Sequence, residues 1–179
     1  MPGIDETRQF VPLKIAVLTV SDTRELADDK SGNTLVERIR AAGHTLAERA
    51  IVKDDVKAIR QRVKAWIADK FIDVVISTGG TGFTGRDVTP EAVEPLFEKR
   101  MDGFSTMFTM ISVPKIGTSA IQTRATAGVA NSTYVFCLPG SPGACKDGWD
   151  DILQYQLDNR LRPCNLVELM PRLQEHEKV

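Results

Sequence analysis

Hydrophobic residues occur in short runs that alternate with amphipathic stretches along most of the chain. Residues 13–20 (LKIAVLTV) form an apolar run rich in β-branched side chains, which is typical of a buried strand. Residues 72–76 and 134–138 repeat this pattern, and residues 44–52 show it more weakly. These runs predict strands that are mostly buried on both faces.

The stretches between these runs have the periodicity of amphipathic helices. Ser31 is a candidate N-cap for a helix that runs to about Ala42 and that Gly43 would end. Asp54 or Asp55 would cap a second helix, because the apolar residues that follow keep the i, i+3, i+4, i+7 spacing of one buried stripe. Those apolar residues are Val56, Ile59, Val63, Trp66 and Ile67.

Later segments add two more helices and one ambiguous stretch. Thr89, as a capping hydroxyl, and Pro90 after it indicate a helix start, and this helix should run to about Lys99. Residues 144–157 predict a further helix. Residues 103–128 begin with apolar residues at helical spacing and continue with an alternating pattern that could form an antiparallel hairpin.

Strands that alternate with helices indicate an α/β fold, with a mainly parallel sheet covered by helices on both faces. The alternating stretch would add a small antiparallel element. A chain of 179 residues, 42% of them hydrophobic, fits one domain with a substantial core. We expect this domain to span residues 13–170, between a flexible lead at 1–12 and a polar tail at 171–179.

Composition and charge exclude several classes of protein. The formal net charge of −1 argues against a general nucleic-acid binder, which normally has a basic excess. No apolar run approaches the roughly 20 residues that cross a membrane, and the first residues lack a signal-peptide core. A soluble cytoplasmic protein with reduced thiols is expected, since the cysteines lack metal-ligand spacing: they are Cys137, Cys145 and Cys164.

Polar residues and glycines follow each predicted strand. Ligands of parallel sheets bind beyond the carboxyl ends of the strands, so these segments are expected to share one rim. The segments are Ser21-Asp22-Thr23, Lys53-Asp54-Asp55, residues 78–82 (TGGTG) and residues 139–143 (PGSPG).

The TGGTG segment has the composition of an anion-binding loop. Gly79, Gly80 and Gly82 let backbone amides approach a ligand closely. The hydroxyls of Thr78 and Thr81 could donate further hydrogen bonds. The segment is not a P-loop, because the Gly-Lys-Ser/Thr ending is missing. A tight turn without a ligand is the alternative.

Two aspartates could supply a cation site beside this loop. Asp87 follows the loop, and Asp54 lies at the neighbouring strand end. Mg²⁺ prefers one or two carboxylates together with phosphate oxygens and water, so both aspartates are candidate metal ligands and candidate catalytic residues. The alternatives are a helix N-cap for Asp54 and a salt bridge from Asp87 to Arg86 or Lys99.

Other residues of the predicted rim have both a functional and a structural interpretation. Each could contact phosphate or another ligand group, or could serve the protein itself as a turn cap, an ion pair or a rigid connector. These candidate ligand-binding residues are Ser21, Asp22, Arg124, Pro139, Gly140 and Ser141.

Several sequence blocks occur in a characteristic order and spacing. They are VLTVSDTR, STGGTGFTGRDVTPEA, FSTMFTMIS, IGTSAIQTRATAGV and LPGSPGACKDGWDDI. Over residues 11–170 the chain closely resembles the molybdopterin adenylyltransferase family, known as MogA and MoaB. Residues 104–129 and the RPCNLVELMP segment look more like the MoaB branch. The resemblance implies an α/β molybdopterin-binding domain that assembles as a homotrimer or as a homohexamer made of two trimers.

The resemblance also implies an activity, in which molybdopterin and ATP give adenylyl-molybdopterin and pyrophosphate with Mg²⁺ as cofactor. The family's two essential aspartates fall on Asp87, inside RDVTPEA, and on Asp54, with the adjacent Asp55 as the alternative. The glycine loop at 79–82 and Ser141 fall on substrate-binding positions. The implied partners are molybdopterin, ATP, further copies of the chain and, as a further option, other molybdenum cofactor biosynthesis proteins.

Three alternatives to this activity stay open after the resemblance, and two of them are a small nucleotide hydrolase on the same kind of sheet and a structural protein that forms hexamers. The chain could be a molybdopterin-binding carrier or scaffold that does not catalyse, although it keeps the Arg-Asp pattern of RDVTPEA, which some relatives in the MoaB branch have lost. The apolar residues at 104–111 are interpreted first as core or oligomer contacts and second as a platform for the pterin.

Overall fold

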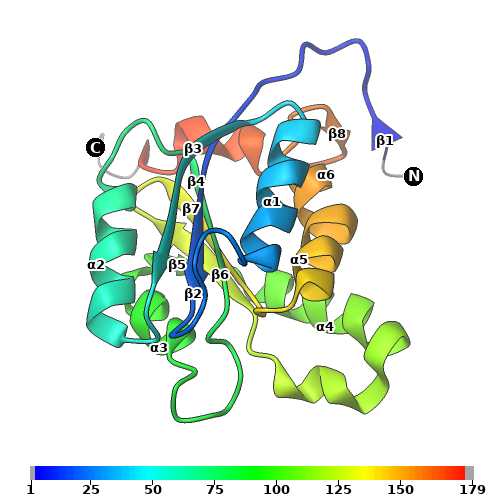
Figure 1. The fold of residues 1–179 in the computed structure, drawn as a ribbon. Helices are drawn as coiled ribbons and strands as arrows, with labels where there is room; N and C mark the ends of the chain where they lie inside the picture. Colours follow the sequence, from blue (N-terminus) through cyan, green and yellow to red (C-terminus); the bar gives the residue numbers. More distant parts are fainter. Residues whose placement is uncertain (1–2, 176–179) are drawn as a thin grey trace.

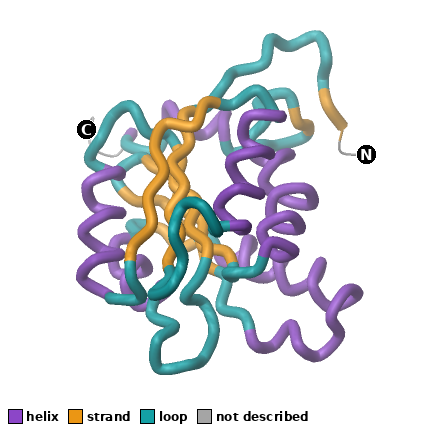
Figure 2. Tube along the Cα trace, viewed as in Figure 1, coloured by secondary structure: helices purple, strands orange, loops and turns teal. Residues whose placement is uncertain are grey.

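The computed structural model describes residues 3–175, which contain a six-stranded mixed sheet with helices on both faces (Figures 1 and 2). The strand order is β3-β2-β4-β7-β6-β5. The pairs β2–β3, β2–β4 and β4–β7 are parallel, whereas β6 pairs antiparallel with β7 and with β5. This confirms the predicted α/β fold. The strands are β2 (Lys14–Val20), β3 (Thr45–Val52), β4 (Val74–Thr78), β5 (Lys99–Arg100), β6 (Thr126–Ala130) and β7 (Thr133–Leu138).

Two groups of helices cover the two faces of the sheet (Figure 1). One face carries α1 (Lys30–Ala41), α4 (Asp102–Ile116) and α5 (Pro142–Gly148), and the other carries α2 (Val56–Ile67) and α3 (Thr89–Val93). Within residues 3–175, none of the helices has the length and apolar character needed to cross a membrane. Shorter elements are 3-10 helices at Glu94–Leu96, Gly117–Gln122 and Val167–Arg172, a π-helical turn at Trp149–Leu153, and α6 (Gln154–Gln156).

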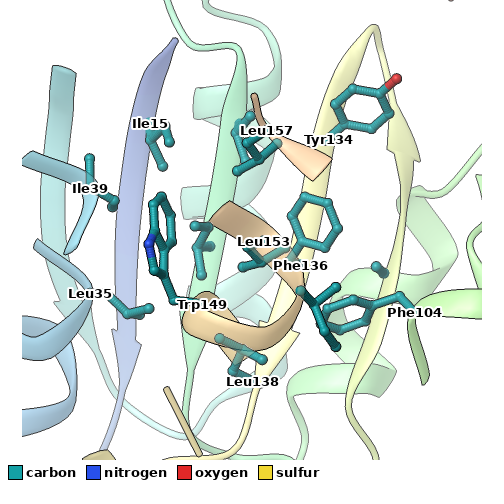
Figure 3. Close-up of a cluster of buried hydrophobic side chains, with 14 of the residues drawn as sticks. Ile15, Leu35, Ile39, Phe104, Tyr134, Phe136, Leu138, Trp149, Leu153 and Leu157 are labelled. Carbon is teal, nitrogen blue, oxygen red and sulfur yellow. The ribbon is translucent and has the colours of Figure 1, made fainter. Parts of the chain in front are cut away.

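The side chains of β2 explain why both faces of the sheet need a cover. Successive side chains of a strand point to opposite faces, and every residue of this run after the first is buried. Ile15 and Val17 join a core under α1, α4 and α5, whereas Ala16 and Leu18 join a second core under α2 and α3. Figure 3 shows the first core, which includes Leu35, Ile39, Phe104, Phe136, Trp149 and Leu153.

The helix expected at residues 89–99 is shorter than predicted. α3 ends at Val93, a 3-10 turn covers Glu94–Leu96, and Lys99–Arg100 form the edge strand β5. Pro95 has no backbone N–H with which to continue an α-helical hydrogen-bond ladder, so the chain leaves the helix at this point.

Two predicted helix caps are wrong. Asp29, not Ser31, caps α1, because its carboxylate accepts the backbone N–H of Gly32 at 2.9 Å. Thr89 does not cap α3, since its hydroxyl donates to the carbonyl oxygen of Gly79 at 2.8 Å. Both side chains are also bound to other parts of the chain, Asp29 to Thr19 and Arg49 and Thr89 to Gly79.

The ambiguous stretch at 103–128 contains both of the structures that its pattern allowed. α4 and the 3-10 helix after it occupy the first part, and β6 occupies the last part, where it forms an antiparallel hairpin with β7. The helix predicted at 144–157 begins at Pro142, changes to a π-helical turn at Trp149 and ends at Gln156.

The first described residues pair with a segment from the last part of the domain (Figure 1). β1 (Gly3–Ile4), within the predicted lead, pairs antiparallel with β8 (Leu161–Arg162). The predicted polar tail begins inside the 3-10 helix Val167–Arg172. Residues 1–2 of the lead and residues 176–179 of the tail lie outside the described residues.

Candidate active site

The register of the parallel strands brings the predicted segments to one rim. Thr19 of β2 lies beside Thr78 of β4, which lies beside Leu138 of β7, and Val20 lies beside Val52 of β3. The segments that leave these strands border a cleft of about 640 Å³. It is lined by Val20, Ser21, Thr23, Arg24, Asp54, Gly79, Gly80, Thr81, Gly82, Asp87, Gln122, Thr123, Pro139, Gly140, Ser141 and Pro142.

The glycine loop at residues 79–82 packs so closely against its neighbours that it requires glycine. Gly79 has a φ of +101°, and a Cβ there would lie 2.2 Å from the carbonyl oxygen of Val20. Gly80 has a φ of +65°, and a Cβ there would lie 2.4 Å from Thr89 Oγ1. Both conformations are disfavoured for other residues, so a side chain at either position would displace the loop from the wall of the cleft.

The loop offers fewer free amides than its composition suggests. The N–H of Gly79 donates to the carbonyl oxygen of Leu138 at 3.0 Å, and the N–H of Gly82 donates to the carboxylate of Asp87. Among the hydrogen bonds of residues 3–175, none uses the N–H of Gly80 or Thr81. A phosphate oxygen at this loop would therefore be bound by these two amides.

The adjacent aspartates Asp54 and Asp55 have different environments. Asp55 caps α2, because its carboxylate accepts the N–H of Ala58 at 2.8 Å. Asp54 lines the cleft, and a Cβ added at Gly80 would lie 3.1 Å from its Oδ1. The N-cap alternative therefore belongs to Asp55, and the carboxylate of Asp54 faces the cleft beside the glycine loop.

The surroundings of Asp54 favour its protonated form. Burial raises the pKa of Asp54, and the neighbouring carboxylates of Asp22 and Asp87 raise it further, whereas the Asp22 backbone amide and Arg86 oppose this. No salt bridge within the described residues involves Asp54; Arg86 pairs instead with Asp22. A bound cation would stabilise the ionised form of this carboxylate.

The surroundings of Asp87 have the opposite effect. Burial tends to raise the pKa of Asp87, but hydrogen bonds from Thr84 and from the Gly82 amide outweigh it and lower the pKa. The hydroxyl and the backbone N–H of Thr84 both donate to Asp87 Oδ2, at 2.6 and 2.9 Å. Asp87 is therefore held ionised by its own loop. The predicted alternative, a salt bridge to Arg86 or Lys99, is wrong.

These two carboxylates flank the glycine loop in a way that fits Mg²⁺. Asp54 lies against Gly80, and a Cβ added at Gly82 would lie 2.8 Å from Asp87 Oδ2. Residues 3–175 contain no group of three or more His, Cys, Asp or Glu side chains that could hold a metal ion. Mg²⁺ commonly takes one or two carboxylates and completes its shell with phosphate oxygens and water, which suits a pair of carboxylates beside an anion-binding loop.

Two predicted ligand residues support the cleft without lining it. Thr78 is buried, and its hydroxyl donates to the carbonyl oxygen of Pro139 at 2.9 Å. The carboxylate of Asp22 accepts from Arg86 Nε at 2.9 Å and from the backbone N–H of Asp54 at 3.2 Å. Asp22 therefore holds Asp54 and Arg86 in place, and does not reach the cleft itself.

Arg124 is the third predicted ligand residue that the structure places behind the cleft. Its Nε donates to the carbonyl oxygen of Gly82, and its Nη2 donates to that of Asp87, both at 2.9 Å. It also forms an ion pair with Glu91. The structural alternative predicted for Arg124 is therefore the observed one, and the guanidinium fixes the backbone on either side of the exposed turn between Gly82 and Asp87.

Comparison with known proteins adds a family to this geometry. Residues 16–159 match the family described as "probable molybdopterin binding domain". The chain belongs to this family. The match covers most of the chain and includes every segment that borders the cleft.

Individual relatives place this molybdopterin-binding domain within the MogA and MoaB group, near MoaB. It is 50% identical over 157 residues to molybdenum cofactor biosynthesis protein B of Escherichia coli (strain K12), covering 88% of this chain and 92% of that protein. A crystal structure of a molybdenum cofactor biosynthesis protein B superposes with a TM-score of 0.84 at 37% identity, covering 94% and 99% of the two chains. The tungsten cofactor synthesizing protein MoaB from Pyrococcus furiosus superposes with a TM-score of 0.66 at 32% identity, covering 92% and 96%.

Ser21 and Ser141 both have the structural role predicted as one of their alternatives. Ser21 Oγ accepts the N–H groups of Thr23 and Arg24, at 3.3 and 3.2 Å. Ser141 caps α5 by accepting the N–H of Ala144 at 3.1 Å. Both serines also line the cleft, and each hydroxyl keeps its own hydrogen as a donor.

Six lining residues of the cleft were not among the predicted site residues; they are Val20, Thr23, Arg24, Gln122, Thr123 and Pro142. Gln122 is the last residue of the 3-10 helix in the ambiguous stretch and Thr123 follows it, and the residue pattern there indicated no ligand. Arg24 lies four residues beyond the end of β2, and a basic residue so close to a predicted rim was a usable signal.

The cysteines of the domain are free, as expected, and two of them are buried near the sheet. Burial raises the pKa of Cys137 to about 12 and that of Cys145 to about 11. Cys145 Sγ lies 3.1 Å from Thr78 Oγ1, directly behind the cleft. Both thiols therefore stay protonated near neutral pH, which is unfavourable for a nucleophile.

Proposed function

We propose that the chain acts in molybdenum cofactor biosynthesis, where it transfers an adenylyl group from ATP to molybdopterin. The observation that carries the proposal is the pair of carboxylates, Asp54 and Asp87, that flanks a glycine loop with two free amides. Two curated relatives, from Escherichia coli and Bacillus subtilis, are named molybdenum cofactor biosynthesis protein B, at 50% and 42% identity, which supports the pathway.

The proposed reaction needs no covalent intermediate on the protein. The terminal phosphate of molybdopterin attacks the α-phosphorus of ATP, a new P–O bond forms, and the bond to pyrophosphate breaks. Such a transfer depends mainly on positioning and on neutralisation of phosphate charge. The high pKa of Cys145, the thiol nearest the cleft wall, agrees with a direct transfer.

Each group in the cleft has a role in this proposal. Mg²⁺ held by Asp54 and Asp87 would supply the positive charge for the ATP phosphates. The amides of Gly80 and Thr81 bind a phosphate oxygen, and the hydroxyl of Ser141 orients the pterin substrate. The supporting contacts of Asp22 and Arg124 keep the carboxylates and the loop in one geometry.

A side cavity supports a flat organic substrate next to the phosphate groups. This cavity of about 230 Å³ shares Thr123 and Ser141 with the cleft. Its other walls include Phe108, Ile116 and Ala144. A pterin ring needs apolar walls and a few polar groups, so the cavity is suited to it. Phe108 belongs to the apolar stretch at 104–111, for which a platform for the pterin was the second of the two interpretations.

A direct assay tests the proposal. The protein is mixed with molybdopterin, ATP and Mg²⁺, and the release of pyrophosphate is measured. We expect release that requires both molybdopterin and Mg²⁺. A carrier or scaffold would bind molybdopterin without releasing pyrophosphate, and a nucleotide hydrolase would act on ATP without molybdopterin. Either of these results would contradict adenylyl transfer.

We further propose that the chain assembles as a homotrimer or homohexamer through α4 and the 3-10 helix that follows it. Large apolar side chains are exposed along these two elements, which is a common property of protein interfaces. Met110 is 66% exposed and Ile121 is 78% exposed. The exposed set is Met107, Met110, Val113, Ile116 and Ile121.

Replacing both Met110 and Ile121 with Glu is expected to shift the sedimentation coefficient to that of a smaller species, because buried charges would destabilise the interface. The control is Phe71→Glu, since Phe71 is 70% exposed but lies outside these two elements. We expect the control to sediment like the wild type. A wild-type chain that sediments as a monomer at micromolar concentration would contradict the proposed assembly.

A further inference from the structure

The cleft carries opposite charges on different side chains. Asp54 and Asp87 line it beside the glycine loop, and Arg24 is the basic side chain among the described residues that line it. None of the salt bridges within residues 3–175 includes Arg24, although most other arginines of the described chain are paired. A half-buried, unpaired guanidinium beside a cleft of this size is a binding group for an anion.

The turn after β2 holds Arg24 in a defined position. Its backbone N–H donates to Ser21 Oγ at 3.2 Å, and its Nη1 donates to Ser31 Oγ at 2.6 Å. Ser31 donates in turn to Asp29 Oδ1 at 3.2 Å. Within the described residues only Nη1 of this guanidinium is engaged, so its Nε and Nη2 edge remains for two oxygens of one anion.

Arg24 lies toward α5, away from the main charges around Asp54. Its Nη1 contacts Ser31 in the first turn of α1, and α1 packs against α5. Asp54 instead lies against Gly80, and its backbone N–H donates to Asp22, which pairs with Arg86. The cleft therefore has a carboxylate side, which suits a metal ion, and a cationic side, which suits an anion without a metal ion.

We propose that Arg24 binds the terminal phosphate of the pterin substrate, a phosphomonoester dianion. This inference rests on the proposed function, in which two phosphate-bearing substrates meet in one cleft. The triphosphate of ATP would lie on the carboxylate side of the cleft, because the carboxylates attract the cation that it carries. The attacking phosphate needs a positive charge from the chain itself, and a guanidinium can hold two of its oxygens while the third attacks.

Titration of molybdopterin alone, without ATP or Mg²⁺, tests this role by calorimetry. Arg24→Met removes the charge at similar volume, and we expect it to raise the Kd for molybdopterin about 10- to 100-fold, as for one lost charge-assisted pair. Arg24→Lys keeps the charge but loses the planar fork, so its Kd should rise less. The matched control is Arg40→Met, on an exposed position of α1, which should bind molybdopterin like the wild type.

The KM for ATP in the pyrophosphate assay separates the two phosphate sources. We expect it to be unchanged in Arg24→Met. A rise in the KM for ATP with normal molybdopterin binding would overturn the inference and would assign Arg24 to the triphosphate. An unchanged Kd for molybdopterin in a variant with the wild-type melting temperature would also overturn it. If Arg24→Met does not fold, Arg24→Lys decides, and a Kd equal to that of the wild type would count against the role.

The binding measurement keeps this inference separable from the proposed function. A wild-type chain that releases no pyrophosphate, but that loses molybdopterin affinity on Arg24→Met, would disprove adenylyl transfer and support the role of Arg24. A wild-type chain that releases pyrophosphate, with molybdopterin affinity unchanged by Arg24→Met, would support adenylyl transfer and disprove the role of Arg24.

Discussion

Replacing Asp54 with Asn is expected to lower the rate of pyrophosphate release at least about 100-fold, whereas Asp55→Asn should change it less than about threefold. Asp54 faces the cleft, and Asp55 caps α2. Asn is as good an N-cap as Asp, so the second variant keeps the helix start. Two adjacent residues of one type thus receive the same substitution, and initial rates at saturating substrates and Mg²⁺ compare them directly.

Asp87→Asn is the companion of Asp54→Asn. We expect the same loss of adenylyl transfer with the fold and molybdopterin binding retained, because an amide cannot replace an ionised carboxylate beside a metal ion. The hydrogen bonds from Thr84 that lower the pKa of Asp87 show that the ionised form is the one held in place. Full activity in either cleft variant would remove the metal assignment. A loss confined to Asp55→Asn would move the role by one residue.

Replacing Asp29 with Ala is expected to lower the free energy of unfolding by about 3–5 kcal/mol. Asp29 is 0% exposed, and its carboxylate accepts from Thr19 Oγ1 at 2.6 Å and from the Gly32 N–H at 2.9 Å. It also forms an ion pair with Arg49 at 2.8 Å. The substitution leaves a partly buried guanidinium without its partner and α1 without its cap.

Chemical denaturation at neutral pH checks this value, with Asp28→Ala as the control. Asp28 is exposed, and within the described residues its carboxylate accepts only the backbone N–H of Glu25, at 2.7 Å, so we expect a loss below about 1 kcal/mol. A loss for Asp29→Ala that is no larger than that of Asp28→Ala would show that the buried ion pair contributes little.

The pH dependence of the difference in unfolding free energy between the wild type and Asp29→Ala is a second test of the role of Asp29. Burial tends to raise the pKa of Asp29, but hydrogen bonds from Thr19, Arg49 and the Gly32 amide outweigh it and lower the pKa. A lowered pKa in the folded state means that the stabilisation is complete above about pH 4, where the unfolded carboxyl is ionised. It is lost as the pH falls through the lower folded pKa. The gap between wild type and Asp29→Ala should therefore narrow below about pH 4, and a gap that widens there would contradict this account.

The sheet and its rim could be predicted because their signals are local. A fully buried parallel strand must be apolar at nearly every position, so residues 13–20, 72–76 and 134–138 stand out in the sequence. The carboxyl ends of parallel strands then lie at one edge without further information. The sequence alone therefore predicts that the glycine loop lies close to the segments that follow β2, β3 and β7.

The partners of individual side chains depend on contacts that no local pattern contains. Asp54 and Asp55 are equivalent in sequence, and the extended backbone of Asp55, with φ −134° and ψ 126°, makes it the cap. Arg124 reaches back 42 residues to Gly82, so its supporting role has no local signature. Asp29, and not Ser31, caps α1, because the distant side chains of Thr19 and Arg49 also hold its carboxylate in place.

Thr89 has a consequence for how the cleft can open. Its hydroxyl donates to the carbonyl oxygen of Gly79 at 2.8 Å, and its N–H donates to that of Gly80 at 2.9 Å. The glycine loop therefore cannot shift relative to α3 without breaking both bonds, and α3 is packed against α2. We expect the side of the cleft that the glycine loop forms to stay fixed. A substrate would then enter past the side that residues 21–24 and 122–123 form. The Thr89 amide becomes a natural reporter, since its exchange with deuterium requires the loop to detach.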